Sequence, residues 1–288
     1  MNEAAAVREA PVSESAAPAQ TAAPGIGAQA DRRAAAAFAR PGLPEIDQSA
    51  EFDVRAYAQT AEGLRPEQAD LAAFTEEPLT RPGLDAVAML AGLCAGCVAQ
   101  LREVLVTPSH RETRVTAFLT TRAYELHWSR QTLRAILAAS GAAAPSHSAG
   151  RRELAPWRPA RRALTSNLLG HDHVALTMTT GLLETLLTDL LHTRLPDLDP
   201  RLAPIALRLH HMAETHAAFY EEQAHLRLAR SRRARLITRA GLRRWRWPGD
   251  QIRPRLPLRA FGTSADLVKL HARLASLPGL TRHHLVTA

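Results

Sequence analysis

Histidine and acidic residues within long apolar segments are the side chains of this sequence best suited to chemistry. Di-iron sites in four-helix bundles need a Glu from each of two helices and a Glu-x-x-His pair from each of the others, because residues three apart share one helix face. In segment 201–242 the apolar residues recur every three or four positions. This stripe consists of Leu202, Ile205, Leu209, Met212, His216, Phe219 and Gln223. We therefore expect His216 to point into the core, with Ala213 one turn before it.

A literal Glu-x-x-His pair, Glu222 and His225, lies in the same segment. At about 100° per residue its stripe, which also contains His211 and Glu214, is about 145° from the core stripe. The pair is therefore predicted to face solvent. A surface zinc site that includes His211 and Glu214 stays open as an alternative.

The corresponding inward positions of segment 109–139 hold residues that cannot bind iron. Leu126 and Ser129 occupy the places where a Glu-x-x-His pair would be needed. Glu125 and His127 flank them but are about 200° apart on a helix, so they cannot grip one ion together. In segment 168–194, Glu184 has three possible roles: a metal ligand, a partner of His216, or an exposed residue. We interpret Leu126, Ser129 and Ala213 as lost ligand positions.

The elements that would position these residues are predicted to be helices. Apolar periodicity covers residues 84–105, 109–139, 168–194 and 201–242, and no segment alternates convincingly with a period of two. Pro108 ends the first helix, and Ser109 with Glu112 resembles a capping box that starts the second. Residues 141–166 form a long connection. Two antiparallel hairpins joined by one long crossover predict an all-α four-helix bundle.

The remaining chain predicts a tail, an arm and a basic extension. Residues 1–40 are rich in Ala and Pro and are expected to be disordered, residues 41–82 to form an arm on the bundle, and residues 83–242 to form the bundle itself. Residues 243–288 read as a basic loop followed by a short helix capped near Thr263 or Ser264. Because there is no basic, apolar leader and no uninterrupted 18-residue apolar run, we expect a cytoplasmic protein without a membrane span.

Cys94 and Cys97 are the two cysteines of the chain and form a Cys-x-x-Cys motif. The motif lies within an apolar helix, and neither a strand-to-helix turn nor two further zinc ligands accompany it. We interpret both cysteines as small buried residues that permit close approach of helices.

Positive charge is concentrated near the end of the chain. The whole sequence has 36 Lys and Arg against 28 Asp and Glu, but residues 227–259 alone contain 12 Arg and one acid, Asp250. Such a field attracts acidic partners. Trp245 and Trp247 could stack on bases, lie at a membrane surface or cover the end of the bundle. The predicted partner-binding residues, on a helix that outruns its apolar stripe, are Arg232, Arg233, Arg235, Arg239, Arg243 and Arg244.

The segment from about Arg111 to Arg255 resembles the ferritin-like superfamily, and within it the acyl-carrier-protein desaturases. The resemblance lies in Tyr124-Glu125 with Trp128, in Glu184, in His216-x-x-Phe219-Tyr220 and in the loop Trp247-Pro248-Gly249-Asp250-Gln251-Ile252. It implies a di-iron enzyme that uses oxygen to insert a double bond into an acyl chain on an acidic carrier protein. Only His216 and Glu184 match ligand positions, and the first-helix carboxylate is missing.

We therefore expect a ferritin-like bundle that has lost its di-iron site, holds no cofactor, and acts by binding an apolar ligand or an acidic partner such as a carrier protein. One alternative is an active di-iron oxidase or desaturase with rearranged ligands. These would be drawn from Glu184, His216, Glu125, His127 and Glu214. A second alternative is a nucleic-acid-binding protein that uses residues 227–259, although no nucleic-acid motif supports it. A homodimer also stays open.

Overall fold

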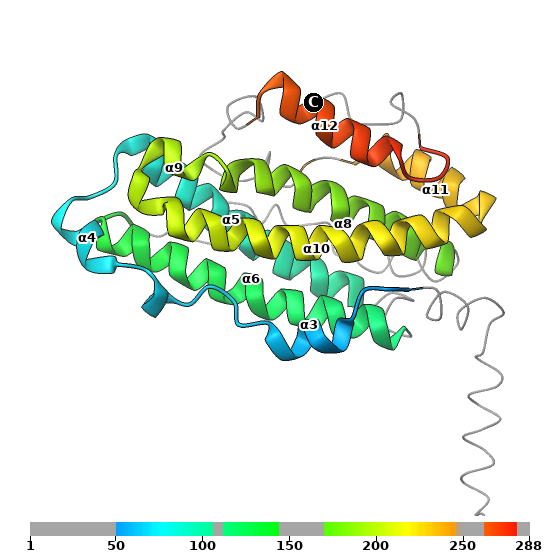
Figure 1. Ribbon diagram of the computed structural model, residues 1–288, viewed down its shortest axis with the longest axis horizontal. Coiled ribbons are helices and arrows are strands. Elements are labelled where there is room, and N and C mark those ends of the chain that lie inside the picture. Colours follow the sequence, from blue (N-terminus) through cyan, green and yellow to red (C-terminus); the bar gives the residue numbers. More distant parts are fainter. Residues whose placement is uncertain (1–49, 106–111, 144–169, 246, 248–261, 281–288) are drawn as a thin grey trace, which may run out of the picture. The chain divides into compact units, whose positions relative to one another are not determined.

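Helices account for all regular secondary structure in the described part of the chain (Figure 1). The computed structural model describes residues 50–105, 112–143, 170–245, 247 and 262–280, and no strand occurs in these ranges. They belong to one unit, Glu45–Ala288. The predicted all-α class is confirmed.

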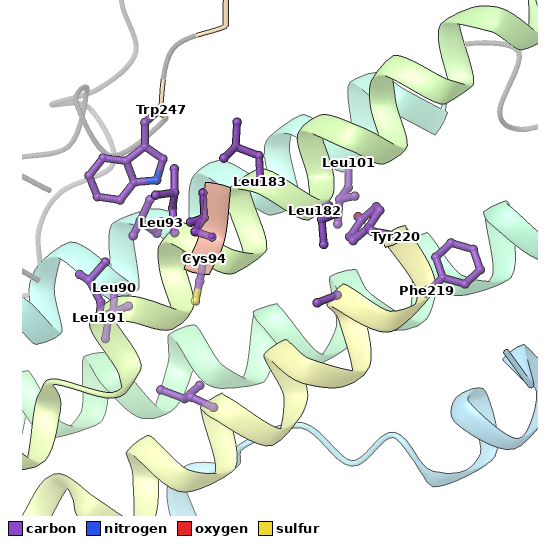
Figure 2. Packing of buried hydrophobic residues seen from close by; sticks show 14 of the residues in the cluster. Leu90, Leu93, Cys94, Leu101, Leu182, Leu183, Leu191, Phe219, Tyr220 and Trp247 are labelled. Atoms are coloured by element: carbon purple, nitrogen blue, oxygen red, sulfur yellow. The ribbon is translucent and has the colours of Figure 1, made fainter. Parts of the chain in front are cut away.

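Four long helices build the core as two antiparallel pairs. Helix α5 (Arg81–Leu105) packs along α6 (Thr113–Ala139), and α8 (His171–His192) packs along α10 (Ala203–Arg230), as Figure 1 shows. Pro82 lies in the first turn of α5, where a missing backbone N–H costs no helical hydrogen bond. The buried side chains of all four helices form a single hydrophobic cluster, part of which is drawn in Figure 2.

Two helix boundaries differ from the sequence prediction. Helix α6 begins at Thr113 after Glu112, whose side chain makes no cap hydrogen bond and instead accepts from Arg227. Ser109, the other member of the predicted capping box, lies outside the described residues, as does most of the 141–166 connection. The predicted continuous helix 201–242 is wrong.

That segment divides into a 3₁₀ turn η4 (Pro200–Leu202), α10, and α11 (Arg232–Leu242). The break occurs at Ser231, whose backbone is extended and whose hydroxyl caps α11 by accepting from the N–H of Ala234. The same hydroxyl donates to Asp172 on α8 at 2.7 Å. Helix α11 then packs against α8 through Ala234, Thr238 and Leu242 instead of extending beyond the core. A short helix α9 (Leu195–Leu198) lies in the α8–α10 connection.

The arm lies on α6. It contains α3 (Val54–Thr60), the 3₁₀ turn η1 (Pro66–Gln68) and α4 (Leu71–Glu76), all of which contact α6. Asp53 caps α3, and Asp70 caps α4, each through its side-chain oxygen. Of the predicted arm 41–82, residues 41–49 lie outside the described ranges and Arg81 already belongs to α5.

The C-terminal helix α12 (Ser264–Ala275) starts with a capping box between Thr263 and Asp266 and packs on α8. Trp247 is buried beside Leu93 and Leu183 (Figure 2), and Trp245 is partly buried against the core. Of the three roles open to these two tryptophans, the structure places them as cover for the helical core.

Two stretches of the core helices have the length and composition of membrane spans. The stretches Arg81–Leu101 and Asp172–Leu198 are long and apolar enough to cross a bilayer. At least half of the most apolar part of each stretch is buried inside the protein. Core helices of soluble proteins share these properties, so the expected lack of a membrane span stays a prediction.

Candidate functional site

A buried hydrogen-bonded triad joins the arm to α6 and α10. The Tyr57 hydroxyl donates to Oε2 of Glu125 at 2.5 Å, and Nε2 of His216 lies 2.7 Å from the same oxygen. The Tyr57 hydroxyl is also 3.0 Å from Nε2 of His216. All three residues are at most 8% exposed. The carboxylate of Glu125 is thus bound from two sides in a buried position.

The arm is held over this triad by aromatic and polar contacts. The ring of Phe52 packs edge-on against Phe118 and Phe219, which are themselves stacked at 3.7 Å. The Phe52 N–H donates to Glu222 at 2.8 Å, and Arg114 donates to the Phe52 carbonyl. These contacts fix the segment that begins α3, so they position Tyr57 above Glu125.

Burial determines the protonation of the triad. It lowers the pKa of His216, and the nearby Arg122 lowers that pKa further, while the hydrogen bond with Glu125 opposes both. Burial also raises the pKa of Tyr57, and the Glu125 carboxylate adds to the rise. At neutral pH the histidine is therefore uncharged and the tyrosine protonated. A neutral imidazole with its proton on Nε2 satisfies Glu125, which accepts from both partners.

A second polar cluster lies deeper between α5, α6, α8 and α10. The Arg122 guanidinium donates through Nη1 to the Tyr220 hydroxyl at 2.5 Å and through Nη2 to Thr185 Oγ1 at 3.2 Å. The Cys97 thiol donates to Oε1 of Glu184 at 2.5 Å. Gly181 makes this packing possible, because a Cβ atom there would come within 2.5 Å of the Tyr220 ring.

The thiols and the tyrosine in and beside the second cluster stay protonated near neutral pH. Burial, and then Glu184, hold the pKa of Cys97 well above its usual range, and burial raises the pKa of Cys94 to about 12. Burial raises the pKa of Tyr220 to about 12 although Arg122 opposes it. Burial alone would lower the pKa of Arg122, but Tyr220, Cys97 and Glu184 outweigh it and the pKa is raised. The Cys-x-x-Cys motif thus contributes two buried thiols and no thiolate nucleophile.

The predicted ligand residues are not brought together as a metal centre. Glu125 was expected beside the inward stripe of α6, yet it is buried and contacts His216. Glu184 is buried and contacts Cys97, so its exposed alternative is wrong. His127 is exposed, and the Glu214 side chain is 63% exposed, so the rearranged set of five ligands does not meet.

Of the other predicted positions, some are buried in the core and others are exposed to solvent. Ser129 and Ala213 are buried and Leu126 is half-buried. His211 and His225 are exposed, whereas Glu222 is half-buried and binds the arm. Within the described ranges, no three His, Cys, Asp or Glu side chains are placed to hold one metal ion. As placed, these residues do not fit a di-iron group.

Sequence reasoning missed Tyr57, Arg122, Tyr220 and Cys97 as members of polar clusters. The helical stripe of Val115 and Leu119 did predict an inward Arg122, and this side chain is buried, but its polar partners carried no signal in the sequence. Tyr57 gave no comparable signal, because the arm has no long periodic pattern.

The six arginines predicted to bind a partner divide into two groups. Arg235 donates to the carbonyls of Leu228 and Ala229 at the end of α10, and Arg239 donates to Gly279 at 2.7 Å. These two therefore serve the fold. Arg233 lies 3.6 Å from Asp172 but stays exposed, and Arg232, Arg243 and Arg244 are exposed with no ion pair to another described residue.

Comparison of the chain with protein-family models, with curated proteins and with solved structures found no match to any of them.

Proposed function

We propose that this protein is a ferritin-like helical bundle without a di-iron site, which binds an acidic partner protein through the outer face of α11. The observation that carries the proposal is a set of exposed arginines that the fold does not use. Arg232, Arg243 and Arg244 lie on α11 or directly after it and are exposed, as is Leu236 of the same helix, at 63%. We define these four residues as the α11 face.

The spacing on α11 places most of this face on one side. Arg232, Leu236 and the C-cap residue Arg243, whose backbone is still helical, are four and then seven residues apart, so they share one stripe, and Arg244 follows directly. An exposed leucine among unpaired guanidinium groups suits an acidic surface with a small apolar contact, because the charges guide approach while the leucine adds buried area.

The polar interior supports a binding role rather than oxygen chemistry. Glu125 and His216 are bound to each other and to Tyr57, and Arg122 supplies a fixed positive charge within electrostatic reach of His216 and Glu184. A guanidinium in this position takes over the charge balance that metal ions supply to carboxylates. The resemblance to carrier-protein desaturases fits a small acidic protein as the partner.

The test is a charge reversal of the α11 face. Arg232→Glu, Arg243→Glu and Arg244→Glu are combined, and binding to a small acidic carrier protein is measured at about 0.15 M salt, where charges are screened beyond about 8 Å. We expect the triple variant to lose binding mainly through a slower association rate that depends less on salt. Its helical content should stay unchanged.

A matched control reverses three exposed arginines elsewhere, Arg55, Arg134 and Arg208. This control changes the net charge by the same amount, so retained binding would assign the effect to the α11 face. Equal loss in both variants would contradict the proposal. Retention of generic duplex DNA in place of the acidic protein would favour nucleic-acid binding, since phosphates are bound without regard to sequence.

A further inference from the structure

The arm divides into two halves that are held to the bundle in different ways. Its second half, residues 64–79, inserts the side chains of Leu64, Phe74 and Leu79, which are at most 4% exposed. Arg201 also donates to two backbone carbonyls of this half, each at 2.7 Å. Because removal of large apolar side chains from the core would expose them to water, this half is firmly anchored.

The first half of the arm, residues 50–61, depends more on polar contacts. We call it the α3 flap, since it contains α3, which lies along α6 (Figure 1). Within α3 only Val54 and Tyr57 are buried. The Phe52 N–H donates to Glu222, and its carbonyl accepts from Arg114. The flap therefore buries less apolar surface than the second half and is held largely by hydrogen bonds and aromatic edges.

A short connection separates the two halves. Residues 61–65 are not helical, and Gly63 has a φ of 68°, which glycine adopts without strain. Gly63 also lies against α6, where a Cβ atom would come within 3.0 Å of the Trp128 Cβ. The chain is thus held close to α6 at Gly63, so backbone rotation before this residue moves the flap without the second half.

The contact beneath the flap is one that water can replace. The Tyr57 hydroxyl contacts Oε2 of Glu125 and Nε2 of His216. If the flap lifts, water takes the place of the hydroxyl, so no polar atom stays buried without a partner. The apolar contacts of Phe74 have no such replacement. Opening of the flap is therefore less costly than opening of the second half.

We propose that the α3 flap opens from the folded bundle while residues 64–79 stay docked, and that this motion gives solvent access to Glu125 and His216. The Tyr57 hydroxyl holds the flap closed. In the open state, His216 presents an uncharged imidazole, bonded to a carboxylate, to molecules in solution. This inference is independent of the α11 face and does not rest on the proposed partner.

Native-state hydrogen exchange of the full-length protein measures the opening of each half. The N–H of Ala61 donates to Tyr57 at the end of α3, and the N–H of Glu77 donates to Ala73 at the end of α4. These two amides are matched in position. Relative to its intrinsic rate, the Ala61 amide should exchange about tenfold faster or more, because it opens with the flap alone. Equal protection of the two amides would overturn the inference.

Access to His216 is measured with diethyl pyrocarbonate, which modifies uncharged imidazole rings. His211 is exposed on the same helix and should react at once, whereas His216 is buried and should react at a rate set by flap opening. Tandem mass spectrometry locates the modified rings. If His216 stays unmodified in excess reagent while the Ala61 amide exchanges many times, the flap does not uncover it and the proposal fails.

Tyr57→Phe keeps the ring and removes the hydroxyl. It should speed exchange at Ala61 and modification of His216 by about five- to tenfold, the equivalent of one hydrogen bond. Tyr124→Phe is the matched control, because the Tyr124 hydroxyl accepts from Arg65 on the exposed side of α6. It should change neither rate. Equal effects of the two variants would contradict the role of Tyr57, and the measurements on the unmodified protein decide the proposal even if Tyr57→Phe does not fold.

Discussion

Glu125 on α6 and His216 on α10 meet at 2.7 Å in the core, where their side chains are only 6% and 4% exposed. The Tyr57 hydroxyl completes the contact from the arm. Each residue thus satisfies polar atoms that would otherwise be buried without a partner.

His216→Ala should lower the free energy of unfolding by about 1–3 kcal/mol, because Glu125 loses one of its two buried donors. The measurement is urea denaturation followed by circular dichroism. His211→Ala, at an exposed position on the same helix, is the control and should change stability little. Equal effects would show that the triad contributes nothing specific.

Protein produced with added iron should contain much less than two iron ions per chain, since Glu125 and His216 are bonded to each other and to Tyr57, and Glu184 is bonded to Cys97. Elemental analysis of the purified protein checks this. Two irons per chain, reduced by Glu184→Gln, would support the active di-iron alternative.

Gly181→Ala should destabilise the protein by about 1–3 kcal/mol, because the added methyl group would overlap the Tyr220 ring, which is itself fully buried. Gly96→Ala is the matched control within α5, where a Cβ atom would meet nothing within 4 Å. It should stabilise the protein by about 0.5–1 kcal/mol through helix propensity. Thermal denaturation of both variants distinguishes these opposite signs. Destabilisation by both would argue against the Tyr220 contact.

Glu112→Ala should cost about 3–5 kcal/mol, since it leaves the guanidinium of Arg227 buried without its carboxylate. Asp85→Ala breaks the exposed Arg81–Asp85 pair and should cost less than about 1 kcal/mol. Denaturant titrations of the two variants provide the comparison. A small effect at Glu112 would mean that water reaches Arg227.

The stability of the protein should depend on the protonation of His210. Its hydrogen bond with Asp189 raises the pKa of His210 above the ordinary value of 6.5. The resulting stabilisation is fully present below pH 6.5 and is lost as the pH rises through the raised pKa of the folded protein.

The measurement is the free energy of unfolding of the unmodified protein and of His210→Gln across that pH range, and the difference between the two is compared at each pH. The difference should shrink as pH rises. His216, whose pKa is lowered, acts in the opposite direction in both proteins and cancels in the comparison. A difference that does not vary with pH would contradict the role of Asp189.

The long helices could be predicted because their apolar residues recur with a helical period. The predicted end of the second helix at Ala139 coincides with the end of α6. The break at Ser231 could not be predicted, because neither a proline nor a glycine marks it. Only the two hydrogen bonds of Ser231, to Ala234 and to Asp172 on a distant helix, reveal the break.

The candidate site could be predicted only in part. The apolar stripe predicted an inward His216, and this side chain is buried. Glu125 lies next to the predicted inward stripe of α6, so the sequence prediction left it outside the core. That prediction considered only one packed face of the helix. The arm covers a second face of α6, so residues outside a narrow stripe become buried. A short segment such as the arm carries too few apolar residues to predict where it lies.

The Tyr57–Glu125–His216 triad also bears on the order of folding. Tyr57 is separated by 68 residues from Glu125 and by 159 from His216. Closing such long loops is slow in comparison with forming a helical hairpin such as α5–α6. We expect the helical pairs to form first and the tyrosine to dock in a late step. During refolding, Tyr57 should become shielded from solvent only after most of the helical signal has been recovered.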